Sequence, residues 1–275
     1  DQTVNIYSAF LQNEWKNDRW GILIGGRLDK HNMVDNVIFS PRANLRFNPT
    51  QNINLRLSYS SGFRAPQAFD EDMHIENVGG TVAMIERAKD LKEEKSQSFS
   101  ASADMYHRFG AFQTNLLIEG FYTRLTDVFV LGEPYDRGDG ILVKTRSNGP
   151  GAKVMGLTLE GKVAYLSILQ IQAGLTLQRS RYDEPHKWHD DAPAEKKIFR
   201  TPDTYGYFTA TCTPIKPLSI ALSGTYTGRM LVQRMDITAE NAELGEMPER
   251  KAEAIRTPRF FDLGVKLAYD FKLYK

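Results

Sequence analysis

Residues 53–60 read INLRLSYS, a run in which apolar and polar side chains alternate strictly. Successive side chains of a β-strand point to opposite faces of a sheet, so this run predicts a strand with one apolar and one polar face. Residues 39–47 precede it with the same period, FSPRANLRF. The two runs together predict a pair of adjacent strands that share one apolar surface.

The same alternation recurs about eleven times along the chain. Several of the runs are about ten residues long, the length that a tilted strand needs to cross a bilayer. Strands of water-soluble sandwiches are usually nearer about 5 or 6 residues. The runs begin near residues 4, 20, 38, 53, 97, 111, 154, 169, 204, 218 and 260. We therefore expect an all-β protein built as a transmembrane, antiparallel, up-and-down β-barrel.

The connections between the runs alternate in length. Short turns are expected at residues 17–18, 49–52, 108–110, 167 and 214–217. Longer polar loops are expected at residues 30–37, 65–95, 132–153, 183–202 and 231–258. Short connections on one side and long ones on the other are typical of outer-membrane barrels, with turns in the periplasm and loops outside.

A water-soluble β-sandwich is the alternative, because its strands also have one apolar face. Charged residues in the middle of the polar runs favour a water-filled lumen, and aromatic residues near the strand ends favour membrane interfaces. The barrel interpretation predicts that these residues face outward: Leu55, Leu57, Leu157, Ile171, Leu222 and Val265. It predicts that these face inward: Arg42, Arg56, Glu160, Thr176 and Thr225.

Composition narrows the possible partners. The 35 basic and 34 acidic residues nearly cancel, so no nucleic-acid partner is expected. Cys212 is the only cysteine, which excludes a disulfide within the chain and a multi-cysteine metal site. No apolar run approaches the roughly 20 residues of a transmembrane helix. We expect no resident cofactor.

The number of runs predicts an incomplete barrel. Bacterial single-chain barrels have an even number of strands and must close, because an open edge in lipid leaves backbone groups unpaired. Asp1 is not followed by a signal peptide, and Lys275 comes directly after a strand-like run. We therefore expect a cut-out whose edge strands, near Val4 and near Phe260, do not pair with each other.

Several short strings resemble the barrel of TonB-dependent receptors, particularly those of the Bacteroides group. Residues 57–66, LSYSSGFRAP, resemble that family's "S-x-G-F-R-A-P" entry to a long loop. Residues 90–96, DLKEEKS, resemble the returning "N-x-x-L-K-P-E-x-S" string, with Glu93 in place of the usual proline. Asn148-Gly149 and residues 154–161 resemble the "N-x-G…V-x-G-x-E-x-E" strand that follows. The similarity extends over essentially the whole chain.

The resemblance implies that residues 1–275 form one partial barrel domain, roughly strands ten to twenty of a 22-stranded barrel. The plug domain, the first strands and the final strands would be absent. It implies a place in the outer membrane of a Gram-negative bacterium, among outer-membrane lipid and lipopolysaccharide. It also implies three partners: TonB, through a segment absent here, the plug domain of the same chain, and a small iron-complex ligand.

The function that follows is active import of a scarce nutrient, with an iron complex (ferric siderophore or haem) as the first choice. A passive porin or adhesin barrel, and cobalamin or glycan uptake, are the alternatives. An enzyme is not expected, because four of the five histidines fall in loops and no G-x-S-x-G elbow is present.

Candidate ligand-binding residues lie in the long loops. His74 lies between the two loop-flanking strings, where haem-uptake members of the family place a haem ligand, although a solvated loop histidine fits its acidic surroundings. A siderophore would be held by basic and aromatic side chains instead, and these are the candidates: Arg64, Arg87, Tyr135, Arg137, Arg146 and Arg181. His186 and His189 could bind a divalent metal in a helical turn, whereas Pro185 between charged residues favours an exposed loop.

Overall fold

The computed structural model describes residues 4–66, 83–132, 135–138, 142–188, 192–237 and 250–271. All regular secondary structure in these ranges is β-strand. The described residues contain no helix of the length and apolarity that would cross a membrane.

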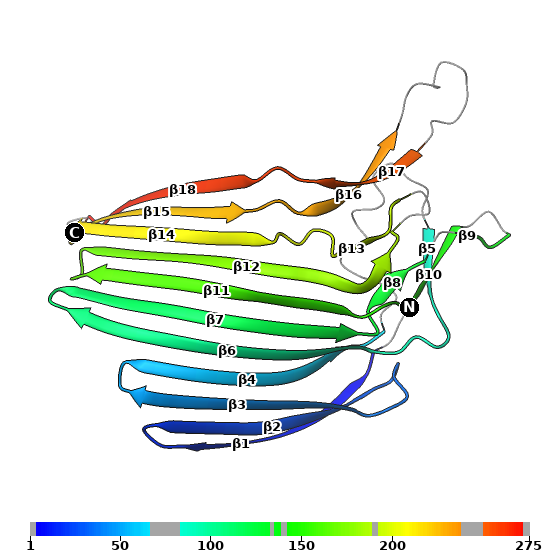
Figure 1. Ribbon diagram of the computed structural model, residues 1–275, viewed down its shortest axis with the longest axis horizontal. Helices are drawn as coiled ribbons and strands as arrows, with labels where there is room; N and C mark the ends of the chain where they lie inside the picture. The colour runs from blue at the N-terminus through cyan, green and yellow to red at the C-terminus, as the bar shows by residue number, and fades with distance from the viewer. Residues whose placement is uncertain are drawn as a thin grey trace.

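Eleven long strands form one antiparallel sheet in which each strand pairs with the next long strand of the chain (Figure 1). They are β1 Ile6–Lys16, β2 Trp20–His31, β3 Ile38–Thr50, β4 Ile53–Arg64, β6 Glu94–Phe109, β7 Phe112–Thr126, β11 Ala152–Tyr165, β12 Leu169–His186, β14 Thr204–Ile215, β15 Leu218–Thr227 and β18 Phe260–Tyr269. Each corresponds to one of the eleven alternating runs. The prediction of an all-β, up-and-down architecture is confirmed.

The two ends of the sheet differ as the connection lengths predict. At one end, here called the turn end, tight turns join the strands, and it lies on the left in Figure 1. Asn17 closes one turn by accepting hydrogen bonds from the backbone N–H groups of Arg19 and Trp20 (2.9 and 2.7 Å). Gly110 closes another with a left-handed φ of 60°, which favours glycine.

The opposite end, here called the loop end, carries short strands that the sequence analysis treated as loops (Figure 1). A four-stranded sheet contains β5 Ala83–Arg87, β8 Phe129–Leu131, β9 Tyr135–Asp136 and β10 Leu142–Asn148. β16 Leu231–Ile237 pairs with β17 Arg250–Arg256, and β13 Glu195–Lys197 pairs with β12. These strands have only two to seven residues, so they lack the long alternation that revealed the others.

The two faces of the large sheet separate as predicted. All six residues expected to face outward are exposed, from 38% for Leu55 to 76% for Val265. The opposite face carries polar pairs between neighbouring strands. Thr158 and Thr176 share a hydroxyl hydrogen bond of 3.0 Å, and Glu160 accepts hydrogen bonds from Gln172 and Tyr207. An apolar outer face with no protein cover suits lipid, and a hydrogen-bonded polar face suits a lumen.

The sheet is open. β1 and β18 lie at its two ends and do not pair with each other, so the barrel does not close within the described residues. That outcome was predicted. The one hydrophobic cluster found in the described ranges is small and lies at the loop end, where Val34, Ile38 and Ala65 pack with Phe63. Backbone pairing, not a buried core, therefore holds most of this sheet together.

Candidate functional site

The family-like strings converge at the loop end. Phe63 and Arg64 at the end of β4 pair with Lys95 and Glu94 at the start of β6. These two strings are about thirty residues apart in the sequence, and they meet because β4 and β6 are neighbouring strands. They form the base from which the loop-end segments project.

Asn148 fixes two chain segments to this base. Its side-chain Oδ1 accepts a hydrogen bond from the backbone N–H of Lys92 (2.8 Å). Its Nδ2 donates to the backbone carbonyl oxygens of Lys92 (3.1 Å) and Asp127 (2.8 Å). The next residue is Gly149, and a side chain is excluded there because a Cβ would lie 2.5 Å from the Val130 side chain. The Asn-Gly string is therefore a structural clamp.

Phe129 lies between two arginines of the candidate set. The guanidinium carbons of Arg64 and Arg146 lie 5.5 and 5.9 Å from the centre of its ring, within the range of cation–π attraction. The Glu94 carboxylate accepts a hydrogen bond from the Phe129 backbone N–H (3.1 Å). Arg146 is only 3% exposed, so its contacts organise the base of the small sheet and do not lie on its surface.

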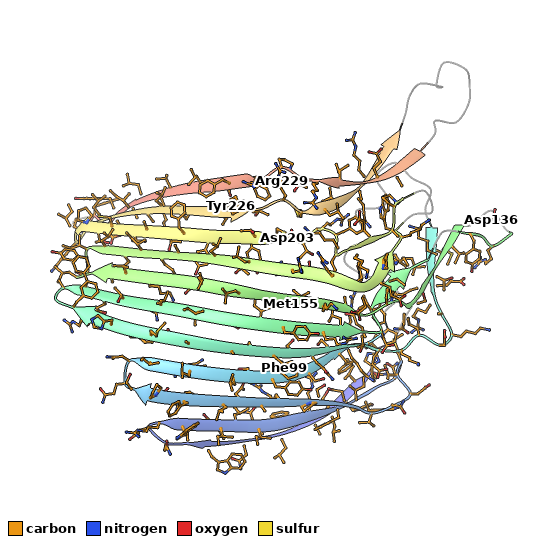
Figure 2. All side chains as sticks on the ribbon, viewed as in Figure 1. Phe99, Asp136, Met155, Asp203, Tyr226 and Arg229 are labelled. Carbon is orange, nitrogen blue, oxygen red and sulfur yellow. The ribbon has the colours of Figure 1, made fainter. Side chains whose placement is uncertain are left out.

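Three further candidates lie on the small sheet itself. Arg87 of β5 is directly opposite Arg146 of β10. Tyr135 of β9 is 47% exposed, and Arg137 follows the strand and forms an ion pair with Glu86 (3.3 Å). Figure 2 shows β9, with its Asp136 labelled, projecting from the loop end. The structure thus gathers five of the candidates for siderophore binding around β10.

Arg181 lies apart from these five. It is on β12, where odd-numbered residues such as Ile171 face outward. It is directly opposite Lys153 of β11 and Lys197 of β13. Its exposed side chain therefore belongs to the outer face of the sheet and not to the lumen.

The histidines are only partly described. His186 is the last residue of β12, opposite Glu195, so it is in extended backbone and not in the helical turn that metal binding with His189 required. Burial lowers the pKa of the His186 imidazole. The pKa of the neighbouring Tyr182 hydroxyl is raised, mainly by burial and to a smaller extent by the Glu94 carboxylate. In the part of the chain that the structure describes, no group of three metal-ligating side chains gathers. His74 and His189 lie outside the described residues.

Sequence reasoning missed some of the residues at this end. Phe129 was not proposed, since a single phenylalanine near a loop gives no signal until its strand partners are known. Arg124, Lys153 and Arg179 were also missed. Their odd or even place in each alternating run would have assigned them to the outer face, next to Arg181.

These features define a class of protein. Long antiparallel strands with an apolar outside and a polar inside, tight turns at one end and elaborated loops at the other, are typical of an outer-membrane β-barrel. The chain belongs to the TonB-dependent receptor family: the family model described as "TonB dependent receptor-like, beta-barrel" matches residues 1–274. Barrels of this family are outer-membrane proteins of Gram-negative bacteria and act as receptors and transporters.

Similar solved structures agree in fold. The siderophore receptor PirA from Acinetobacter baumannii matches with a TM-score of 0.68 at 15% identity, over 98% of this chain and 40% of its own. The ferric enterobactin receptor PfeA from Pseudomonas aeruginosa (mutant G324V) matches with 0.69 at 16%, over 98% and 38%. The FrpB iron transporter from Neisseria meningitidis (F3-3 variant) matches with 0.66 at 15%, over 97% and 38%. The chain thus spans about 40% of the PirA structure. No curated protein matches this chain.

Proposed function

We propose that this chain forms part of an active transporter of the outer membrane that imports a scarce iron complex, a ferric siderophore or haem, with energy from TonB. Family membership supports the receptor role. The solved structures of similar fold include a siderophore receptor, a ferric enterobactin receptor and an iron transporter, which supports iron as the cargo. A plug domain of the same chain and TonB would be the protein partners.

The observation that carries the proposal is the set of basic and aromatic residues at the loop end. Arg64, Arg87, Tyr135 and Arg137 lie on or beside the small sheet, where the loops of a barrel meet the external medium. A ferric siderophore that carries negative charge would be held there by charge-assisted hydrogen bonds and aromatic contacts, with no direct bond to iron. Loops on a rigid barrel are common places for such contacts.

The first experiment tests these arginines in the intact receptor. Arg87→Gln with Arg137→Gln removes two cations and should weaken ferric siderophore binding by about tenfold or more, since hydrogen bonds to charged groups contribute about 1.5–3 kcal/mol each. Arg19→Gln with Lys216→Gln, which removes two cations at tight turns of the opposite end, is the matched control. Titration followed by intrinsic fluorescence gives the affinities. Equal affinity in all variants would contradict the assigned site.

Haem is tested on the same preparations. Titration of wild type and His74→Ala, followed by the Soret band, decides whether His74 is an axial ligand. Unchanged haem binding in His74→Ala, or no binding in wild type, removes that role and leaves a siderophore, with cobalamin or a glycan as competitors. A passive porin or adhesin would behave differently, because its transport would continue in cells that lack TonB.

A further inference from the structure

The inner wall of the sheet is basic on two neighbouring strands. β3 and β4 contain neither aspartate nor glutamate, and together they contain four arginines: Arg42, Arg46, Arg56 and Arg64. These arginines lie on the inward face, because the residues between them, such as Leu55, face outward. The inward rows of the strands that follow contain carboxylates: Asp104 on β6, Glu119 on β7 and Glu160 on β11. The inner wall of β3 and β4 therefore differs in charge from its neighbours.

The four arginines lie at regular levels along the strands, and we call them the arginine ladder. Arg46 is directly opposite Arg56, and Arg42 is directly opposite Ser60. Measured along β4, the cations occur at the levels of residues 56, 60 and 64, so neighbouring levels are about 13 Å apart. The three levels span about 26 Å of strand, or about 19 Å along the membrane normal at a tilt of about 45°. The ladder therefore crosses most of the membrane.

Three of the four arginines keep their charge without an acidic partner. Within the part of the chain that the structure describes, no carboxylate lies within ion-pair distance of Arg42, Arg46 or Arg56. The Arg56 Nε donates to the Asn54 Oδ1 (2.7 Å), and the Arg46 Nη2 donates to the Asn17 carbonyl oxygen (3.4 Å). These neutral acceptors orient the two guanidinium groups and leave the positive charge uncompensated.

A strip of small residues lies beside the arginine ladder on the inward faces of β4 and β6. Its members, here called the serine strip, pair across the two strands: Ser58 with Ser100, Ser60 with Ser98 and Gly62 with Ser96, followed by Ser102 opposite Arg56. Figure 1 shows β4 and β6 side by side between the loop end and the turn end. Serine hydroxyls both donate and accept hydrogen bonds, so the strip is polar and has little side-chain bulk.

Large inward-facing side chains near the serine strip lean away from it. Phe121 of β7 is directly opposite Ser100, but its ring covers Gly156 of β11, where a Cβ would lie 2.6 Å from the ring carbon Cζ. On the other side, Arg46 leans toward β2, since a Cβ at Gly21 would lie 3.1 Å from its Nε. These two large side chains therefore leave the strip uncovered.

We propose that the arginine ladder and the serine strip form the inner-wall path along which a negatively charged cargo moves from the loop end toward the turn end. Arg64, beside Phe129 at the loop end, would be the first contact. Arg42 would follow, and then the pair of Arg46 and Arg56. A path must bind its cargo at several sites, and weakly enough at each for the cargo to leave. Separate cations on a wet wall meet this requirement.

The proposal rests on the proposed function and narrows its cargo to iron complexes of net negative charge, such as those with catecholate or carboxylate ligands. The competing interpretation is that carboxylates of the plug domain pair with the arginine ladder. A plug held in this way would keep the serine strip covered, whereas a path must be open while cargo is transported. Two experiments on the intact receptor separate these interpretations.

The charge test compares binding and uptake of ferric enterobactin, a tris-catecholate. Arg42→Gln with Arg56→Gln should leave the affinity unchanged and lower TonB-dependent uptake about fivefold or more, because one contact between exposed unit charges changes an equilibrium by about that factor. Arg42→Lys with Arg56→Lys keeps the charge and should restore uptake. Lys162→Gln with Lys266→Gln, which removes two inward-facing cations of β11 and β18, is the matched control. Equal uptake in the two glutamine double variants, each verified as folded by heat-dependent gel mobility, overturns the proposal.

The access test measures the potential beside the arginine ladder directly. Ser60→Cys in a Cys212→Ser background is treated with an anionic and a cationic thiosulfonate of equal size, in cells that contain TonB and ferric enterobactin. The ratio of anionic to cationic reaction rates should fall about fivefold or more when Arg42→Gln and Arg56→Gln are added, and should not fall with Lys162→Gln and Lys266→Gln. Absence of any reaction at residue 60 means that the plug covers the strip, and this result or an unchanged ratio overturns the path.

The path and the cargo assignment can fail separately. If the receptor binds neither ferric enterobactin nor haem, the iron cargo assignment fails, and a ratio that depends on Arg42 and Arg56 assigns the path to another anionic cargo. If ferric enterobactin binds normally, and neither its uptake nor the ratio depends on these two arginines, the path fails and the cargo assignment stands.

Discussion

At the scale of single residues, one amide holds the loop end together. Asn148 uses its side-chain oxygen and nitrogen to tie Lys92 and Asp127 to the end of β10, which replaces strand pairing where the strands diverge. The bond to the Asp127 carbonyl is partly buried and the two bonds to Lys92 are exposed, so water can replace only part of what Asn148 provides. The clamp therefore explains why an Asn-Gly string lies at this position.

Asn148→Ala leaves the Lys92 N–H and two carbonyl groups without their partner. We expect a loss of about 0.5–1.5 kcal/mol of folding free energy, concentrated at the loop end. Thermal unfolding of the intact receptor, with hydrogen exchange of residues 88–93 and 127–130, measures it. Asn52→Ala, in an exposed turn, is the control. Unchanged exchange in those segments would show that backbone pairing alone suffices.

At the scale of the strand, the alternation of apolar and polar residues places the two faces of each strand in two different media, lipid and water. Leu175 is exposed on the outer face, six residues beyond the turn that begins β12. Thr225 faces the other side, opposite Tyr207 and Asp262. Both positions are exposed in this chain, so only the surrounding medium distinguishes them.

Leu175→Arg should cost about 2–4 kcal/mol in a membrane, because the charge enters hydrocarbon far from either interface. Thr225→Arg should cost little, because its side chain enters a wet lumen. Reversible unfolding of the intact receptor in lipid vesicles, monitored by tryptophan fluorescence, compares the two variants. In a water-soluble sandwich the order of the two free-energy costs would differ. Equal costs for Leu175→Arg and Thr225→Arg would contradict the assignment of the outer face to lipid.

At the scale of the whole molecule, the open edges limit what these residues can do alone. β1 and β18 each leave one side without a strand partner among the described residues. In hydrocarbon an unpaired backbone N–H or C=O costs several kcal/mol, and in water such edges pair with other chains.

Residues 1–275 produced by themselves should therefore neither insert into vesicles as a protease-resistant barrel nor remain monomeric in water. Light scattering and protease protection test both expectations. The intact receptor, prepared in the same way, should insert and resist protease. A monomeric, inserted and protected form of residues 1–275 would mean that β1 and β18 can close a small barrel after all.

The sequence by itself determined the eleven long strands, their two faces, the end that carries the long connections and the openness of the sheet. It could do so because a period of two and a length of about ten residues are local properties of a tilted membrane strand. Only the tertiary structure decided how the loop-end residues combine. Short polar strands such as β10 carry no periodic signal, and contacts such as those of Phe129 with Arg64 and Arg146 depend on which strands are neighbours. The same holds for Arg124, Lys153 and Arg181, which come together only through the register of β7, β11 and β12.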